Sequence, residues 1–179
     1  MIIGEKMKII FVTGGTRSGK SAFAVKEAGK LSGKKAYIAT TEVLDEEMKV
    51  RVDKHRKERG SKWQTIEEPL KISELIKQIT DKYSVIVLDC LTLWLSNLML
   101  SGIKIENEFD KLAETLKQLK LSTLNSQLFI ISNEVGMGIV PENKLARQFR
   151  DLAGTLNQKV AEISDGVYMV ASGIPIKIK

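Results

Sequence analysis

The sequence has little of the chemistry that cross-links a chain or binds metal through sulfur. Cys90 is its only cysteine, so an intramolecular disulfide is impossible and a zinc site built from thiolates is excluded. A chain without disulfides suits a reducing compartment. We therefore expect a cytoplasmic protein.

Long apolar runs are also missing. The most apolar run, LTLWLSNLML (91–100), has about half of the ~20 residues that a membrane-spanning helix needs. The N-terminal stretch MIIGEKMKIIFV is interrupted by glycine, glutamate and two lysines, which is atypical of a signal peptide. Low-complexity tracts and internal repeats are absent as well. These features predict a soluble protein with no membrane span.

What the chain does have is an excess of positive charge. It carries 28 Lys and Arg against 22 Asp and Glu, for a net charge of +6. Such a balance favours an anionic partner, which is either a nucleic acid or the phosphates of a small molecule. The length of 179 residues predicts one domain over residues 1–179.

Short apolar runs alternate with helical patterns along the chain. Because the runs are continuously apolar, they are typical of parallel strands buried on both faces. Apolar residues at helical spacing predict helices over 105–119 and 145–163. This alternation predicts an α/β domain, with a mostly parallel sheet and helices on both faces. The expected strands are KIIFVT (8–13), KAYIAT (35–40), SVIVLD (84–89), QLFIIS (127–132) and GVYMVAS (166–172).

A phosphate-binding motif follows the first expected strand directly. GGTRSGKS, residues 14–21, matches G-x-x-x-x-G-K-S/T, and a helical pattern follows it. Glycines let backbone amides converge on phosphate oxygens, and the helix N-terminus faces the same anion. Lys20 would reach the β and γ phosphates, the Ser21 hydroxyl would bind Mg²⁺, and Arg17 adds a cation. We call residues 14–21 the P-loop.

An acidic residue for the metal stands at the end of another strand. VIVLD ends in Asp89, where P-loop proteins place the aspartate that serves Mg²⁺. The plainer interpretation is an aspartate that caps the next helix. The neighbouring Cys90 is expected to be a small buried residue and not a reactive thiol.

The only histidine, His55, lies in the cationic stretch VRVDKHRKERGSK (50–62). A helical pattern ending at Gly60 would place Arg51 and Arg59 one turn before and one turn after it. Three interpretations compete: a solvated basic face, a nucleic-acid patch, or a phosphate site with a nucleophile. Neighbouring cations lower the pKa of an imidazole, and a neutral imidazole can attack phosphorus.

Together these motifs resemble those of the bifunctional adenosylcobinamide kinase / adenosylcobinamide-phosphate guanylyltransferase family of cobalamin biosynthesis. The resemblance extends from about Met7 to Lys179, with residues 1–6 as a leader. It is carried by GGTRSGKS, the His55 segment with WQTIEEP, LDCLTLWLSN, SNEVGMGIVPENKLARQFRDLAGTLNQ and SGIPIKIK.

This resemblance implies a RecA-like P-loop fold, a homotrimer and two reactions. In the first, ATP or GTP phosphorylates adenosylcobinamide. In the second, GTP donates GMP through a guanylylated histidine at the position of His55, giving adenosylcobinamide-GDP and pyrophosphate. Lys20 is the other implied catalytic residue, and Mg²⁺ is the implied cofactor, bound by Ser21 and Asp89. The implied nucleotide contacts are Gly14, Gly15, Thr16, Arg17, Ser18, Gly19, Lys20, Ser21, Ala39, Thr40, Thr41, Arg56, Lys57, Glu58, Arg59, Glu67 and Asp89.

Some alternatives stay open from the sequence. Asn133 and Glu134 follow the QLFIIS run, where they would either sense a ligand or belong to a loop that holds subunits together. The whole chain could also be a plain P-loop kinase with a structural His55, or a RecA-like module that depends on nucleic acid. The resemblance favours neither a nucleic-acid partner nor a membrane.

Overall fold

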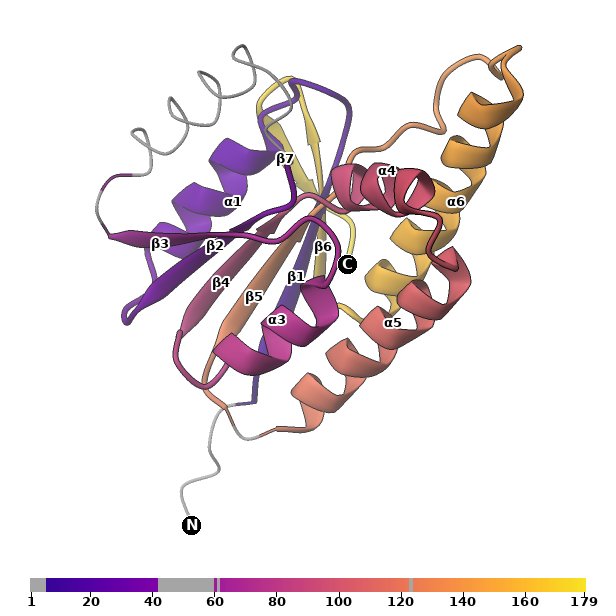
Figure 1. The fold of residues 1–179 in the computed structure, drawn as a ribbon. Coiled ribbons are helices and arrows are strands. Elements are labelled where there is room, and N and C mark those ends of the chain that lie inside the picture. The colour runs from indigo at the N-terminus through magenta and orange to yellow at the C-terminus, as the bar shows by residue number, and fades with distance from the viewer. Residues whose placement is uncertain (1–5, 42–59, 61, 123) are drawn as a thin grey trace.

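The computed structural model describes residues 6–41, 60, 62–122 and 124–179, and a seven-stranded sheet runs through them (Figure 1). The strand order is β3-β2-β4-β5-β1-β6-β7, and every neighbouring pair is parallel except β6 and β7. The strands are β1 (Lys8–Thr13), β2 (Lys35–Ala39), β3 (Trp63–Glu67), β4 (Val85–Asp89), β5 (Gln127–Ile131), β6 (Gly166–Ala171) and β7 (Ile174–Lys177).

The five strands predicted from apolar runs are confirmed, each to within one residue at either end. These are β1, β2, β4, β5 and β6. No continuous apolar run predicts β3 or β7, the two edge strands. β3 is partly exposed and all four residues of β7 are exposed, so neither strand has the continuous apolar pattern of the buried central strands.

Helices cover both faces of the sheet, as predicted (Figure 1). On one face α1 packs Ala24 and Ala28 against β1, β2, β4 and β5. The other four helices that the structure describes cover the opposite face, where they share one large core. The described helices are α1 (Lys20–Gly29), α3 (Ile72–Ile79), α4 (Leu91–Ser101), α5 (Ile105–Leu121) and α6 (Lys144–Ile163).

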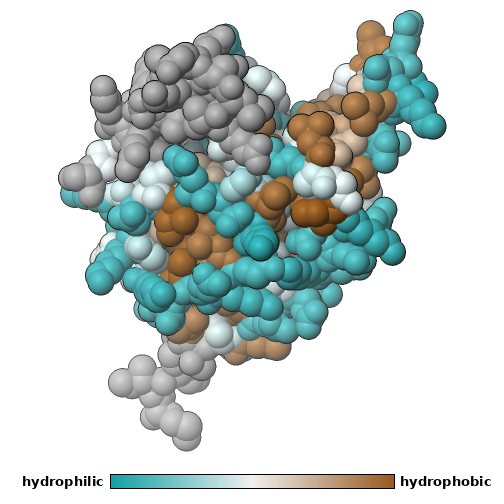
Figure 2. Space-filling model, in the orientation of Figure 1, coloured by the Kyte–Doolittle hydropathy of each residue, from teal (hydrophilic) through white to brown (hydrophobic). Residues whose placement is uncertain are grey.

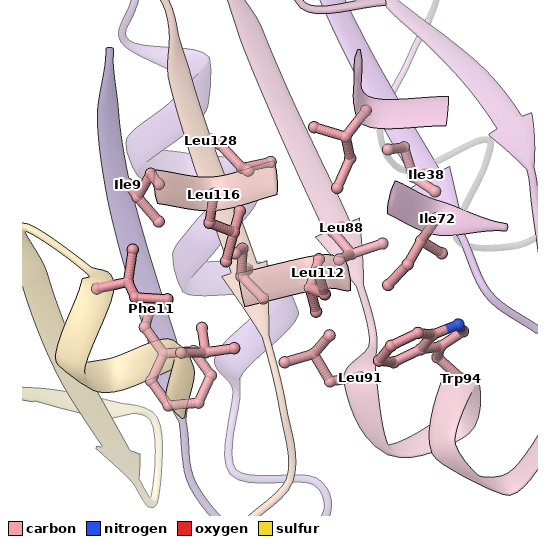
Figure 3. Packing of buried hydrophobic residues seen from close by; sticks show 14 of the residues in the cluster. Ile9, Phe11, Ile38, Ile72, Leu88, Leu91, Trp94, Leu112, Leu116 and Leu128 are labelled. Atoms are coloured by element: carbon pink, nitrogen blue, oxygen red, sulfur yellow. The ribbon is translucent and has the colours of Figure 1, made fainter. Parts of the chain in front are cut away.

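The apolar run at 91–100 forms α4, and Leu91 and Trp94 of this helix pack into the larger core (Figure 3). Trp94 has no exposed surface, and its indole N–H donates a hydrogen bond of 2.8 Å to the Leu70 carbonyl. A helix that is apolar on most sides is typical of one that is largely buried inside a protein. Among the helices that the structure describes, none is long and apolar enough to span a membrane.

Asp165 fastens the start of β6 to β1 and α5. Its side chain accepts a 2.8 Å hydrogen bond from the Ile9 amide and forms a 2.8 Å ion pair with Lys120. Burial raises the pKa of Asp165, but the hydrogen bonds from Lys120 and Ile9 outweigh it, so the pKa lies below its usual value.

We expect Asp165→Asn to lower the free energy of unfolding at neutral pH by about 1 kcal/mol, a value that allows for solvent screening of the ion pair. Because the folded-state pKa is depressed, this stability is present above the unfolded-state pKa and is lost as pH falls through the folded-state pKa. In urea unfolding, the free energies of unfolding of Asp165→Asn and of the unaltered protein should converge as the pH is lowered from neutral to acidic. Asp110→Asn is the control, because its ion pair with Lys159 is at the surface. If the difference in free energy of unfolding between Asp165→Asn and the unaltered protein persisted at acidic pH, the stabilising role of the Asp165 carboxylate would be contradicted.

Candidate functional site

The strand register brings several of the predicted site residues into one row. Glu67 of β3 pairs with Ala39 of β2, and Ala39 pairs with Asp89 of β4. Asp89 in turn pairs with Ile131 of β5, which also pairs with Val12 of β1. Because these strands are parallel, their carboxyl ends share one edge of the sheet, where α/β proteins bind ligands. The P-loop starts at the same edge.

The P-loop joins β1 to α1, as the motif predicts. Gly15, Thr16 and Arg17 are exposed, and Arg17 and Gly19 have left-handed backbones, with φ of 58° and 98°. The Gly19 carbonyl accepts a 2.9 Å hydrogen bond from the Phe23 amide, which starts the helix at Lys20. The helix N-terminus therefore opens directly from the loop and supplies a favourable site for an anion.

Backbone hydrogen bonds hold the loop from two sides. The Glu134 amide donates to the Gly14 carbonyl at 2.9 Å, and the Gly173 amide donates to the Ser18 carbonyl at 2.8 Å. Gly173, which lies in the turn between β6 and β7, was not among the site residues predicted from the sequence. The dipeptide Ser-Gly, at positions 172 and 173, was the available signal, because glycine favours tight turns.

Lys20 lies folded against its own loop. Its side-chain amino group donates to the Gly15 carbonyl at 2.5 Å, and the residue is only 6% exposed. Burial lowers the pKa of Lys20, and the nearby Cys90 and Asp89 offset part of that effect. An incoming phosphate would supply the negative charge that this buried cation lacks.

Asp89 lies half-buried beside this lysine, at the end of β4. The Tyr37 hydroxyl donates a hydrogen bond of 2.5 Å to one of its carboxylate oxygens, and the Tyr37 ring packs edge-on against Trp63. This partner was missed because the two residues are 52 positions apart in sequence. The adjacent Cys90 is buried as predicted, and burial raises the pKa of its thiol.

Thr40 and Thr41 follow β2 at the same edge. Thr40 has no exposed surface, and its hydroxyl both donates to the Cys90 carbonyl and accepts from the Cys90 amide, each at 2.8 Å. The Thr40 side chain therefore ties β2 to β4, while Thr41 is half-buried. His55 and the residues from Arg56 to Arg59 lie outside the described part of the chain, as does the helix predicted to end at Gly60.

Asn133 and Glu134 lie where the sequence predicts them, just beyond β5. The Asn133 side chain donates to the Thr92 hydroxyl at 2.8 Å, so the loop is attached to α4. The Glu134 amide bonds to Gly14, and its carboxylate accepts a 2.7 Å hydrogen bond from the Gly136 amide. The loop is thus attached to the P-loop at one end.

Beyond Glu134 this segment becomes exposed and apolar. Met137 is 75% exposed and Ile139 is 97% exposed. A groove of about 560 Å³ lies between α4 and the start of α6, and it is lined mainly by apolar side chains, including Met99, Val135 and Phe149. Hydrophobic atoms gather at the projecting end of α6 in Figure 2. Large exposed apolar surface is typical of an interaction site.

Sequence comparison identifies relatives over almost the whole chain. The profile of the cobinamide kinase / cobinamide phosphate guanyltransferase family matches residues 10–178. The bifunctional adenosylcobalamin biosynthesis protein CobU of Escherichia coli is 40% identical, over 96% of this chain and 99% of that protein. The protein of the same name from Salmonella typhimurium is 39% identical over the same shares. CobP of Pseudomonas aeruginosa is 36% identical, over 94% of this chain and 95% of its own.

Solved structures with a similar fold are more distant in sequence. The RadB recombinase superposes with a TM-score of 0.54 at 15% identity, over 90% of this chain and 73% of its own. An ATPase from a type III secretion system of pathogenic bacteria superposes with a TM-score of 0.59 at 13% identity, over 90% of this chain and 50% of its own. These likenesses confirm the predicted RecA-like P-loop fold and concern the fold alone.

We expect a nucleoside triphosphate to bind with uptake of protons onto Lys20. The lysine pKa is lowered in the free protein, and bound phosphates would raise it again, so uptake should grow as pH rises toward the ordinary lysine range. Calorimetry at about pH 9, where the phosphates themselves no longer titrate, would measure it in buffers of different ionisation enthalpy. Lys20→Arg is the control, because a guanidinium stays charged. Equal uptake by the variant would contradict the assignment to Lys20.

Proposed function

The chain belongs to the cobinamide kinase / cobinamide phosphate guanyltransferase family, and from that premise we propose how its residues carry out both reactions. The protein is a bifunctional transferase of cobalamin biosynthesis, acting as adenosylcobinamide kinase and adenosylcobinamide-phosphate guanylyltransferase. The observation that supports the residue roles is the position of Lys20. It is buried at the start of α1, beside Asp89, with its amino group turned toward the P-loop.

In the kinase step, the aminopropanol hydroxyl of adenosylcobinamide attacks the γ-phosphorus of ATP or GTP. A phosphorus–oxygen bond forms to the hydroxyl oxygen, the bond to the nucleoside diphosphate breaks, and the hydroxyl proton is released. The catalytic contribution of the chain is mainly positioning and charge neutralisation. Lys20, Arg17 and the P-loop amides would neutralise the phosphate oxygens, while α1 directs its N-terminus at them.

In the guanylyl step, neutral His55 attacks the α-phosphorus of GTP and pyrophosphate leaves. A phosphate oxygen of adenosylcobinamide phosphate then attacks the same phosphorus, and the phosphorus–nitrogen bond breaks, which frees His55. The cationic neighbours that keep the imidazole neutral would also hold phosphate oxygens. This role rests on the sequence and the family, because His55 lies outside the described residues.

A magnesium ion fits the oxygen donors at this edge. Ser21 lies half-buried in the first turn of α1, and Asp89 ends β4 close to Lys20. Within the described residues no group of three or more His, Cys, Asp or Glu side chains could hold a metal alone. Mg²⁺ commonly uses one or two protein ligands together with substrate phosphates, so a hydroxyl and a carboxylate suit it. When bound, it would neutralise charge on the departing phosphate groups.

The remaining nucleotide contacts are proposed from the sequence and the family to which the chain belongs. They are the P-loop residues, Ala39, Thr40, Thr41, Glu67 and the stretch from Arg56 to Arg59. Ala39, Glu67 and Asp89 share one row of the sheet edge. We also propose that the chain forms one domain and that the protein is located in the cytoplasm, where its single cysteine stays reduced.

The two other classes considered from the sequence are not favoured. A plain kinase would not need the His55 segment. The chain also matches a bifunctional family over residues 10–178, which a plain kinase would not explain. A nucleic-acid-dependent module would fit the basic charge and the fold it shares with RadB, but at 15% identity that likeness concerns the fold alone. The anionic partner is therefore proposed to be nucleotide phosphate.

Incubation with α-labelled GTP should leave about one label per chain after denaturation, because the histidine becomes a covalent carrier. The label should be acid-labile and alkali-stable, and γ-labelled GTP should leave none. His55→Asn should abolish labelling, whereas Lys54→Gln, a change within the same cationic stretch, should retain it. Unchanged α-labelling in His55→Asn would refute the proposed nucleophile.

We further propose that the protein is a homotrimer in which the exposed segment from Met137 to Val140 contacts a neighbouring subunit. Ile139 and Val140 are 97% and 57% exposed, which is unfavourable for an isolated chain in water. The apolar groove beside α4 and α6 provides a surface of matching character. The groove is lined by Val135 and Pro141, which flank the segment, so segment and groove together form one apolar surface. A head-to-tail contact through this surface closes into a ring when the rotation between neighbouring subunits is one third of a turn.

Ile139→Asp should shift the protein from trimer to monomer, because the interface would have to bury an unpaired carboxylate. Size-exclusion chromatography with light scattering would measure the mass. Leu121→Asp is the matched control: Leu121 is 79% exposed at the end of α5, so its substitution should leave the trimer intact. A trimeric Ile139→Asp protein would place the interface elsewhere.

A further inference from the structure

The turn between β6 and β7 has a hydrogen-bond donor that its own hairpin does not need. Ala171 pairs with Ile174, leaving Ser172 and Gly173 as a two-residue turn. Their φ angles of 51° and 81° are those of the mirror-image turn that suits the twist of a hairpin. In such a turn the flanking residues make the hairpin hydrogen bonds, so the second turn amide points outward. Here the Gly173 amide donates to the Ser18 carbonyl of the P-loop at 2.8 Å.

The hairpin also packs against both glycines that the P-loop motif requires. A Cβ atom on Gly14 would lie 2.3 Å from the Val170 carbonyl oxygen, which no real contact allows. A Cβ atom on Gly19 would lie 3.3 Å from the Gly173 Cα. The backbone of the hairpin therefore touches that of the loop at Gly14 and at the Ser18–Gly19 peptide. The hairpin and the loop lie side by side in Figure 1.

The geometry of the peptide bond connects this contact to phosphate binding. The carbonyl of Ser18 and the amide of Gly19 belong to one planar trans peptide, so they point in opposite directions. When the Gly173 amide holds the Ser18 carbonyl toward the hairpin, the Gly19 amide is aimed away from it. The Glu134 amide acts in the same way on the Gly14 carbonyl and so orients the Gly15 amide. These loop amides are the donors that a phosphate uses.

We propose that Gly173 is a positioning residue for phosphate binding: its amide fixes the Ser18–Gly19 peptide, and its left-handed backbone is required to place that amide. The inference rests on the proposed nucleotide chemistry and extends the nucleotide site to the C-terminal hairpin. Gly173 does not touch the substrate in this account. It acts through the P-loop, by holding the loop in its binding conformation before the ligand arrives.

A graded series at position 173 tests the role of the backbone. A Cβ atom there would meet nothing within 4 Å, so only the φ of 81° resists substitution. Asparagine tolerates this conformation, alanine resists it and valine resists it most. We expect the Kd for GTP to stay within about twofold in Gly173→Asn, to rise several-fold in Gly173→Ala and to rise about tenfold in Gly173→Val.

Gly102 provides a matched control elsewhere in the fold. It follows α4 with a φ of 71°, and a Cβ atom there would also meet nothing within 4 Å. Gly102→Ala and Gly102→Val should lower thermal stability as the changes at 173 do, with no change in the Kd for GTP. Hydrogen exchange should quicken at residues 14–20 only in the Gly173 variants, and near the end of α4 only in the Gly102 variants.

Inorganic tripolyphosphate distinguishes positioning of the P-loop from contact with the nucleoside. Its Kd should follow the same order across the Gly173 series as the Kd for GTP. Weaker GTP binding with unchanged tripolyphosphate binding would overturn the inference, because the turn would then contact base or ribose. Unchanged binding of both ligands in Gly173→Val would also overturn it, while leaving the proposed function intact. Failure of the unaltered protein to bind GTP would instead refute the proposed function.

Discussion

The site depends on how the carbonyl groups of the P-loop are held. A loop rich in glycine has many accessible conformations, and ordering it at the moment of binding would reduce affinity. In this protein the Gly14 and Ser18 carbonyls are bonded by amides from two other parts of the chain, at Glu134 and Gly173. Both donors are backbone amides, so no particular side chain in the sequence marks them. Their positions follow from the order of the strands in the sheet. Glu134 follows β5 and Gly173 follows β6, and these two strands lie on either side of β1.

The same edge concentrates charge in a way that favours an anionic ligand. Lys20 is buried, which lowers its pKa, and Asp89 offsets only part of that effect. The Asp89 carboxylate is in turn engaged by the Tyr37 hydroxyl. In the proposed function, a triphosphate with Mg²⁺ would supply negative charge to the lysine and positive charge to the carboxylate together. We therefore propose that the arrangement suits the metal–nucleotide complex more than either component alone.

The sequence predicted the parts of this fold that follow a repeating pattern or a fixed motif. β1, β4 and the P-loop could be predicted because buried parallel strands are continuously apolar and the motif has rigid spacing. β7 could not, because Pro175 argues against a strand anywhere except at an edge. The helix α4 is apolar on most sides, so periodicity does not distinguish it from a strand. Contacts such as that of Tyr37 with Asp89 depend on register between distant strands, which no local pattern encodes.

The two glycines of the motif illustrate how one residue can meet two demands. Glycine in a P-loop is usually explained by the approach of phosphate to the backbone. Here the Val170 carbonyl occupies the space where a side chain of Gly14 would lie, and a Cβ atom on Gly19 would be tight against the Gly173 Cα. Gly14 therefore excludes other residues even before a ligand binds, while Gly19 resists them through this contact and its φ of 98°. Because β6 and its turn impose that requirement, the C-terminal hairpin and the phosphate site are coupled parts of one structure, although about 150 residues separate them in the sequence.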